Sequence, residues 1–215
     1  MTLSPTPRST IKRGKNRAVT EREALHAVLD AGMVCHLAVV VDGAPLVVPT
    51  GYGRHEDTLY LHGSTGARSL REAATGVPVC VAITLVDGVV YARSVFDHSM
   101  NYRSAIVHGT ALTVTDPDEK SLGLQVLTEN IAPGSWDYAR PPSVKELAAT
   151  SVLKLDLAEA SVKIRSGPPG DEDEDVLAGE RWAGVLPLHT YWGTPEPDPT
   201  LVGDWDVPEH VSGRK

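Results

Sequence analysis

The chain has 215 residues, of which 41% are hydrophobic, so it is long enough to bury a sizeable core in one large domain. Aromatic residues make up only 5%, with a single Phe, and we therefore expect a core of Val, Leu, Ala and Ile. The net charge of −8 argues against general nucleic-acid binding. No apolar run is long enough for a membrane span, and the N-terminus lacks the apolar segment of a secretory signal. These features predict a cytoplasmic protein that contacts neither nucleic acid nor membrane.

The two cysteines and the two ends of the chain set further limits. Cys35 and Cys80 both lie in apolar strand-like runs and are expected to be buried free thiols, as in a reducing compartment. No group of Cys and His residues has metal-ligand spacing, so no metal site is predicted. Residues 1–15 are polar, and residues 191–215 are rich in proline. We expect one domain over residues 16–190, between a flexible N-terminal arm and a Pro-rich C-terminal tail.

Helix and strand signals follow in chain order. Thr20 and Glu23 have capping-box spacing, and the helix that they begin is expected to end at Gly32. Two Asp-Gly pairs, which start at Asp42 and Asp87, are typical of hairpin turns. Strands are expected over 33–41, 46–52, 58–62, 79–86, 89–95, 104–115, 152–157 and 161–165. Further helices are expected over 67–74, 116–130 and 144–149.

This order of elements favours a mainly β fold, an antiparallel β-barrel with a few peripheral helices. Consecutive strands are joined by short hairpin turns, and the regular alternation of strand and helix that builds a parallel sheet is missing. The apolar runs are nearly continuous, which indicates strands that are buried on both faces. A barrel of such strands is expected to pack against a second copy, and we predict a homodimer.

The most informative segment joins the third strand to the short helix after it. The strand ends at His62, a small-residue turn follows from Gly63 to Gly66, and Arg68 lies in the first turn of the helix. Glycines let a backbone approach a ligand closely, and the start of a helix attracts anions, phosphate above all. The segment therefore suggests a phosphorylated cofactor. The alternative interpretation is an ordinary strand–turn–helix junction with an exposed arginine.

A second polar segment runs from Arg93 to Ser104 and joins two expected strands. It is dense in hydrogen-bonding groups, and loops of this kind often carry function. The alternative is a solvated loop with a few capping contacts, in which His98 is a surface histidine.

Taken together, these segments resemble a known family. The runs that carry the resemblance are Leu61-His62-Gly63-Ser64, Gly66-Ala67-Arg68, Asn101-Tyr102-Arg103-Ser104, Gly109-Thr110-Ala111, Arg140-Pro141-Pro142 and Ala149-Thr150-Ser151. They are similar to the flavin-binding proteins related to pyridoxamine 5′-phosphate oxidase, in particular to the nitroimidazole reductase branch. The resemblance spans about residues 16–190. It implies an FMN-binding split β-barrel that dimerises, with the flavin at the subunit interface.

The resemblance also implies positions for the cofactor. Ser64 and Arg68 match positions that hold the flavin phosphate, and an arginine offers fixed donors to a dianion. The strand segment that starts at Pro49 matches one that runs along the flavin ring, and Trp182 lies where a C-terminal segment can reach the flavin of the partner. The full set implied to bind cofactor is Pro49, Thr50, Gly51, Tyr52, His62, Gly63, Ser64, Ala67, Arg68, Tyr102, Arg103, Ser104 and Trp182. Related split barrels bind FAD, the deazaflavin F420 or haem, so these stay open as alternatives to FMN.

His62 matches a histidine near the flavin in the nitroimidazole reductase branch, where it positions substrate or donates a proton. The alternative is a strand-end histidine bonded to backbone. The resulting hypothesis is a flavin-dependent oxidoreductase that reduces a small electron-poor molecule, with His62 as catalytic residue. The alternatives are a protein that binds or stores FMN or FAD without turnover, and an F420-dependent reductase. Arg181 and His189 do not form the phosphate clamp of the true oxidases, so vitamin B6 synthesis is not predicted.

Overall fold

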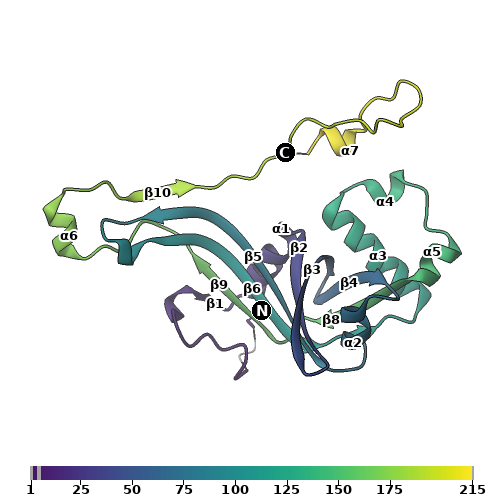
Figure 1. Cartoon of the computed structure of the whole chain (residues 1–215), viewed down its shortest axis with the longest axis horizontal. Coiled ribbons are helices and arrows are strands. Elements are labelled where there is room, and N and C mark those ends of the chain that lie inside the picture. The colour runs from purple at the N-terminus through teal and green to yellow at the C-terminus, as the bar shows by residue number, and fades with distance from the viewer. Residues whose placement is uncertain (1, 4–5, 215) are drawn as a thin grey trace.

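A computed structural model describes residues 2–3 and 6–214, and one antiparallel sheet dominates it (Figure 1). The strands are β1 (Ala18–Val19), β2 (Val34–Val41), β3 (Ala44–His55), β4 (Thr58–Ser64), β5 (Pro78–Tyr91), β6 (Ser99–Thr110), β7 (Leu112–Thr113), β8 (Thr150–Asp156), β9 (Ala160–Arg165) and β10 (Gly184–Pro187). The helices are η1 (Lys15–Arg17), α1 (Arg22–Ala31), α2 (Arg68–Ala73), η2 (Val95–Asp97), α3 (Pro117–Ile131), α4 (Ser135–Tyr138), α5 (Val144–Ala149), α6 (Asp173–Ala178) and α7 (Glu209–Ser212). The prediction of a mainly β protein is confirmed.

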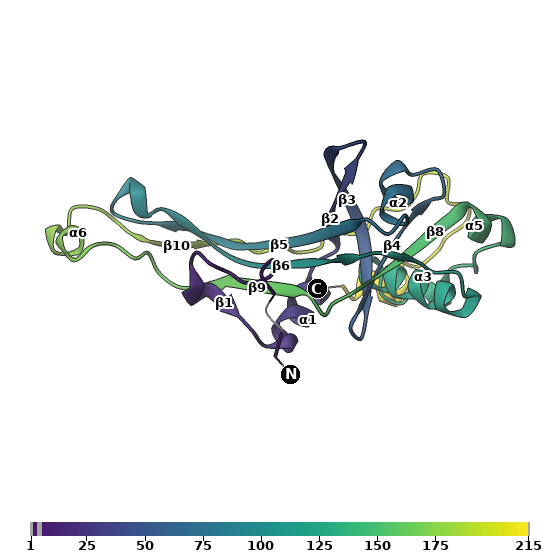
Figure 2. The same cartoon turned by 90° about the horizontal axis from the view of Figure 1, so that it is seen from below.

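The sheet closes on itself because β7, at one end of the strand order, is joined along the chain to β6, near the other end. The hydrogen-bonded order is β1-β9-β6-β5-β2-β3-β4-β8-β7, with β10 added to β5. β7 continues β6 directly, since only Ala111 separates them, and yet it pairs with β8 at the far end of the order. β9 in turn follows β8 after a short turn. The closed part is the barrel, and the outer halves of β5 and β6 project from it as a long arm (Figure 2).

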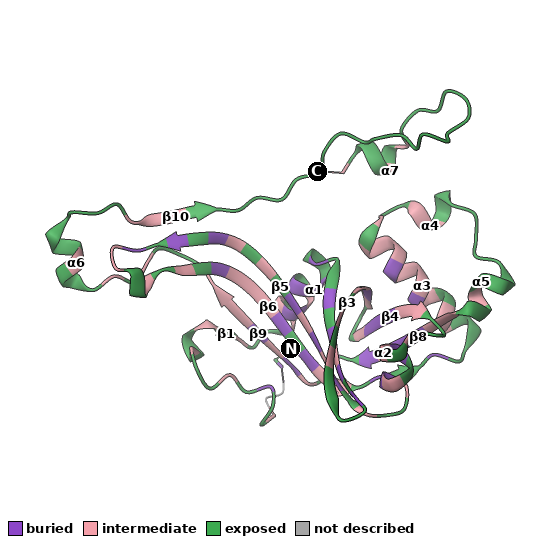
Figure 3. Ribbon diagram, viewed as in Figure 1, coloured by how far each residue is buried: buried purple, intermediate pink, exposed green. Residues whose placement is uncertain are grey.

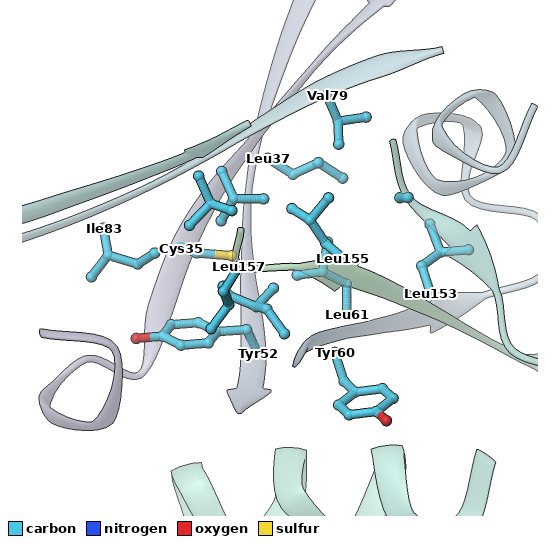
Figure 4. Close-up of a cluster of buried hydrophobic side chains, with 14 of the residues drawn as sticks. Cys35, Leu37, Tyr52, Tyr60, Leu61, Val79, Ile83, Leu153, Leu155 and Leu157 are labelled. Atoms are coloured by element: carbon cyan, nitrogen blue, oxygen red, sulfur yellow. The ribbon is translucent and has the colours of Figure 1, made fainter. Parts of the chain in front are cut away.

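Aliphatic side chains fill most of the barrel, as the composition predicts, and Tyr52 and Tyr60 are large aromatic exceptions (Figure 4). Buried positions follow the inner faces of the central strands (Figure 3). Both cysteines are free thiols, as expected. Cys35 is fully buried, which raises the pKa of its thiol to about 12, whereas Cys80 on β5 is only half-buried. The expectation of burial therefore holds in full for Cys35 alone.

One of the two Asp-Gly turns is confirmed and the other is wrong. Asp42 and Gly43 both have positive φ, 52° and 78°, and they turn β2 back into β3. Asp87 and Gly88 instead lie within the continuous strand β5, where the register with β6 shifts at a bulge. A Cβ atom on Gly88 would come within 2.8 Å of the Leu186 carbonyl oxygen, so this glycine is required by close packing against β10.

The segment from Arg93 to Ser104 connects two strands, as expected, but only its first half is a loop. The true hairpin turn lies further along, around η2, and β6 begins at Ser99 rather than at Ser104. The side chain of Asp87 explains why the chain does not turn at Asp87. Its carboxylate accepts hydrogen bonds from Nε and Nη2 of Arg103 on the neighbouring strand, at 3.0 Å and 2.7 Å. This cross-strand ion pair holds the two strands together where a turn was expected.

The helices differ from expectation mainly at their starts. α1 begins at Arg22, and its N-cap is Glu21 without a side-chain cap bond, so the capping box at Thr20 is wrong. The Thr20 carbonyl is used differently, since it accepts a hydrogen bond from the Leu3 N–H and so pairs with the N-terminal segment. α3 begins as expected, with Pro117 in its first turn and Asp116 capping the Glu119 N–H at 2.8 Å.

α3 packs directly on the barrel because small residues face it. A Cβ atom on Gly53 of β3 would lie 2.5 Å from the backbone of Val126, and one on Gly123 of α3 would lie 2.9 Å from the ring of Tyr60. The two backbones therefore approach more closely than any side chain would permit. This contact positions α3 over β3 and β4, next to the end of β4.

The two ends of the chain are held at defined points. At the N-terminal arm, Arg8 forms an ion pair with Glu159, and Ser9 is buried. The C-terminal tail runs from β10 back to α7, which lies near α3 and α4 (Figure 1). There the ring of His210 lies 4.9 Å from that of Tyr138, and Nη1 of Arg214 donates to the Ile131 carbonyl oxygen at 2.7 Å. Within the described ranges, no helix has the length and hydropathy needed to cross a membrane.

Candidate functional site

The end of β4 lies between two hollows of different chemistry. On one side, His62 faces a cavity of about 610 Å³ between β4 and the helices α3, α4 and α5. On the other side, Arg68 lines a polar hollow of about 590 Å³ beside α2. Both volumes lie in the range of small-molecule and cofactor sites. The turn from Gly63 to Gly66 separates them, so a single short segment supplies residues to both.

The His62 side chain is held in this cavity without a polar partner. Its Nδ1 atom is buried and forms no hydrogen bond within the part of the chain that the structure describes. Burial alone lowers the pKa of the imidazole, because the charged form loses its hydration. The expected alternative of a histidine bonded to backbone is therefore not what the structure shows. An unpaired buried polar atom costs stability, so it indicates a site for a ligand.

The walls of this cavity combine apolar side chains with polar and charged ones. Its lining consists of His62, Leu124, Thr128, Ser135, Trp136, Asp137, Ala139, Arg140, Pro141, Pro142, Glu146, Leu147 and Thr150. Two of the hydroxyls are already used inside helices, since Thr128 donates to the Leu124 carbonyl and Thr150 donates to the Glu146 carbonyl. A smaller hollow of about 260 Å³ adjoins the same histidine and extends along α3 to Ile131. A ligand with an apolar body and a few polar or metal centres matches this lining.

One edge of the cavity is a stapled loop. Arg140 donates from both Nη atoms to the Glu146 carboxylate, at 2.9 Å and 2.5 Å. Glu146 also accepts the Ser143 N–H at 2.7 Å and completes a capping box at the start of α5. The Arg140 guanidinium and the Ser143 hydrogen bonds lower the pKa of Glu146 to about 2. The loop with Pro141 and Pro142 is thereby held against the cavity.

The turn after β4 differs from a simple phosphate cradle. The Gly66 N–H donates to Ser64 Oγ at 3.2 Å, the Ala67 N–H donates to the Ser64 carbonyl at 2.9 Å, and the Thr65 N–H donates to Ala149. These amides are therefore occupied within the chain. The ligand-binding capacity lies instead in the adjacent hollow, which is lined by Arg68 and Arg71 together with Asp42, Thr75 and Ser151.

Arg68 already has a partner in this hollow. Its guanidinium forms an ion pair with Asp42 at the β2–β3 turn, and both side chains are largely exposed, at 67% and 80%. Exposed pairs of this kind contribute little to stability. An anionic ligand therefore competes with Asp42 for Arg68 at little cost.

The segment from Pro49 to Tyr52 lies on β3 and serves mainly the core. The Tyr52 hydroxyl donates to the Leu29 carbonyl at 2.5 Å, and the backbone carbonyl of Tyr52 accepts a hydrogen bond from Nδ2 of Asn130 at 3.0 Å. The close approach at Gly51 is made by Ile131 of α3, which would lie 2.9 Å from an added Cβ. The side chain of Thr50 is half-buried on the same strand. Within one protomer, Gly51 and Tyr52 thus pack against α3, whereas Pro49 is exposed.

The remaining expected contacts lie elsewhere in the protomer. Tyr102, Arg103 and Ser104 lie on β6, which β5, β2 and β3 separate from β4 in the sheet. Arg103 lines a different hollow, with Asp87 and His189, of about 490 Å³. Trp182 is 71% exposed beside Tyr91 near the end of the long arm. The chain folded alone does not bring these residues to the Arg68 hollow.

Several residues of the cavity were not anticipated as site residues. Trp136 and Asp137 lie on the four-residue helix α4, which is too short to produce a hydrophobic period. Leu124 and Thr128 lie on α3, where nothing in the sequence distinguishes them from residues that pack against the core. The usable signals were Arg140-Pro141-Pro142 and Ala149-Thr150-Ser151, two runs that the family resemblance includes without a stated role.

Residues 21–164 match the family described as pyridoxamine 5′-phosphate oxidase, and the barrel has the corresponding fold. The chain therefore belongs to this family of split β-barrels. The structure of the flavocytochrome Anf3 from Azotobacter vinelandii is 36% identical over 99% of both chains, with a TM-score of 0.92. An FAD and haem binding protein from Mycobacterium smegmatis is 40% identical, over 92% of this chain and 97% of that one, with a TM-score of 0.88.

The nitroimidazole branch is only a distant relative. A Bacteroides thetaiotaomicron structure, provisionally described as a 5-nitroimidazole antibiotic resistance protein, is 20% identical over 68% of this chain and 86% of that one, with a TM-score of 0.58. That similarity extends to the fold alone. No functionally curated protein matches the chain in sequence.

The burial of His62 predicts a specific pH dependence in the protein without ligand. The folded state holds the imidazole neutral, whereas the unfolded chain takes up a proton below its ordinary pKa of about 6.5. The contribution is absent above that pH and destabilises the folded state as the pH falls below it. Urea unfolding at pH 7.5 and 5.5 should therefore show a larger loss for the parent than for His62→Leu. Equal losses would show that His62 is no less basic when folded.

Proposed function

We propose that this protein is a flavocytochrome, a redox protein that binds a flavin dinucleotide and a haem. The observation that carries the proposal is the half-buried imidazole of His62, whose Nδ1 is buried and unpaired, at a cavity that leucine, proline and tryptophan side chains help to line. Histidine is a common axial ligand of haem, and an apolar pocket suits the porphyrin. Two structures with 36% and 40% identity, a flavocytochrome and an FAD and haem binding protein, support the same conclusion.

The cavity residues divide this task among themselves. His62 would offer a ring nitrogen to the haem iron, and Leu124, Leu147 and Trp136 would help to exclude water from the cavity. When bound, a haem supplies one-electron transfer and oxygen chemistry, whose direction depends on the polarity around it. α3 fixes the distance between the two walls because Gly53 and Gly123 hold it against the barrel.

The flavin half of the proposal rests on the Arg68 hollow. Arg68 and Arg71 offer donors to a phosphate or pyrophosphate, and Ser151 adds a hydroxyl. The preferred cofactor is FAD rather than FMN, because FAD is the flavin named for the 40% identical relative. The residues on β6 and the long arm would then complete the flavin site across a twofold axis.

A haem in the His62 cavity changes the role that the oxidoreductase hypothesis gives to His62. A reductase of a small electron-poor molecule needs His62 free to position substrate or give up a proton, whereas an axial ligand is committed to a metal. We propose that His62 would act as a ligand of the haem iron, and that the flavin and the haem would together supply electron transfer. The alternatives of flavin storage and of F420 use predict a cavity that takes up no haem.

The test is the absorbance spectrum of the purified protein, before and after reconstitution with haemin. We expect an intense Soret band together with flavin absorbance, and mass analysis of the released cofactors should give FAD and haem b. NADH or dithionite should reduce both chromophores. A protein that retains flavin but develops no Soret band with haemin would contradict the haem half. One that takes up neither would contradict the proposal entirely.

The Arg68 hollow provides a paired prediction for the flavin. Arg68→Ala should weaken flavin binding by roughly 1.5–3 kcal/mol, or about 10- to 150-fold, because it removes hydrogen bonds to a charged group. Asp42→Asn is the matched control, since it removes the competing partner and asparagine tolerates the positive φ at this turn. It should leave binding unchanged or tighter in a fluorescence titration. Equal losses in both variants would place the phosphate elsewhere.

The homodimer stays a prediction and can be tested through the exposed apolar face of the barrel. Val34 and Val40 on β2 and Val47 on β3 are each more than half exposed. We expect a dimer with an interface above about 2,000 Å². Val47→Asp should shift the protein to monomer by light scattering at micromolar concentration. Val144→Asp, on the exposed side of α5, should not. A monomeric parent would remove the shared flavin site.

A further inference from the structure

Arg140 lies on the wall of the His62 cavity and holds its loop through Glu146, but no role in ligand binding has been assigned to it so far. It is the one cationic side chain among the described residues that line this cavity. Asp137 and Glu146 are acidic, the hydroxyls of Thr128 and Thr150 donate to helix carbonyls, and the remaining donors of the lining, on Ser135 and Trp136, are neutral. An anionic group on a cavity ligand therefore has a single obvious partner.

We propose that Arg140 is the anion anchor of the His62 cavity, and that it holds the carboxylates of a planar apolar ligand by exchanging its bonds to Glu146. The inference rests on the proposed function for the identity of that ligand, a porphyrin with carboxylate side chains. It adds the residue that orients the ligand in the cavity, which the unpaired histidine alone does not provide.

The geometry favours such an exchange. The Arg140 side chain is 70% exposed and its partner Glu146 is 48% exposed, so the pair lies at the mouth of the cavity and remains hydrated. Exposed ion pairs contribute little to stability, and their loss is correspondingly cheap. A planar guanidinium binds carboxylates through two parallel hydrogen bonds, so one carboxylate can replace another with the same geometry.

Glu146 keeps other hydrogen bonds when Arg140 no longer pairs with it. Its carboxylate accepts the Ser143 N–H, and the Ser143 hydroxyl accepts the Glu146 N–H, so the capping box survives without the arginine. The loop that carries Pro141 and Pro142 is thus fixed by a second set of bonds. Arg140 is free to serve the ligand without loosening the wall.

The experiment compares three probes by titration of the ligand-free protein: haemin, its dimethyl ester and metal-free protoporphyrin IX. Arg140→Gln should weaken haemin about 10-fold, the low end for a charged hydrogen bond at an exposed site. It should leave the ester unchanged, because the ester has no carboxylate to lose. Protoporphyrin IX, which has the carboxylates but no metal for His62, should be weakened by a similar factor. Arg181→Gln is the control, since that arginine pairs loosely with Glu180 and lies outside the cavity.

A second variant distinguishes an Arg140 that binds the ligand from one that only holds the loop through Glu146. Glu146→Gln keeps a side chain that supports a capping box and releases Arg140, so it should leave haemin affinity unchanged or higher. If Glu146→Gln weakens haemin as much as Arg140→Gln does, or if the ester is weakened equally, the pair is a structural staple and the anchor is overturned.

The outcomes also separate this inference from the proposed function. If iron binding does not depend on His62 but protoporphyrin IX still depends on Arg140, the haem proposal fails and the anchor stands. A parent that binds none of the three probes overturns both.

Discussion

Replacement of His62 by Leu should abolish tight haem binding while the protein stays folded and retains its flavin. Loss of a residue that merely orients a metal ligand costs about 10- to 100-fold in affinity, so loss of the ligand itself should cost at least about 100-fold. The unfolding free energy of the ligand-free protein should stay the same or rise, because an unpaired buried Nδ1 is replaced by an apolar group. Haemin titration and urea unfolding measure the two effects.

The control is His98→Leu, since His98 lies at the tip of the long arm, far along the sheet from β4. It should bind haemin like the parent. An undiminished Soret band in His62→Leu would place the axial ligand elsewhere. The older hypothesis of His62 as proton donor would then be testable by stopped flow, since His62→Gln should slow substrate-dependent flavin reoxidation roughly 100-fold.

Gly53→Ala should be among the most destabilising single substitutions in the barrel. Its added methyl group would lie 2.5–2.6 Å from backbone atoms of Val126 and Leu127, which cannot move aside as a flexible side chain can. Overpacking of this kind costs typically 1–3 kcal/mol, and we expect the upper part of that range. Because α3 forms one wall of the His62 cavity, a shifted α3 should also weaken haemin binding.

Gly170→Ala is the matched control, since a methyl group there meets no atom within 4 Å and its φ is not positive. Urea unfolding should give it the stability of the parent. A Gly53→Ala protein with parental stability would show that α3 sits less closely on β3 than the backbone geometry requires.

The sequence predicted the barrel because its signals are local. The nearly continuous apolar runs of the strands and the turn at Asp42 and Gly43 act within a few residues, and both the strands and this turn are present in the fold. The Asp87 turn failed because the same dipeptide serves another purpose. There, Arg103 pairs with the carboxylate and β10 packs over the glycine, and neither contact is visible in the local sequence.

In the candidate site, too, the sequence predicted the residues that have local signals and not those that depend on packing between distant segments. His62 and Arg68 were anticipated because a strand, a glycine turn and a basic helix lie together in the chain. The cavity that surrounds His62 could not be anticipated, since α4 and the Arg140 loop are far away in sequence and have no period of their own. That His62 lacks a partner follows only from their packing.

The short helix α7 offers a way to watch the cavity from outside. It rests on α4 through the His210 and Tyr138 rings, while Arg214 bonds to Ile131 at the end of α3 and stacks on Trp192 at 3.8 Å. α4 is itself a wall of the cavity, so a dye attached to the exposed side of α7 would sit one helix away from the bound ligand. Its emission would report occupancy by energy transfer without touching the site. For the same reason, affinity tags and fusion partners belong at the N-terminal arm, where they leave this contact undisturbed.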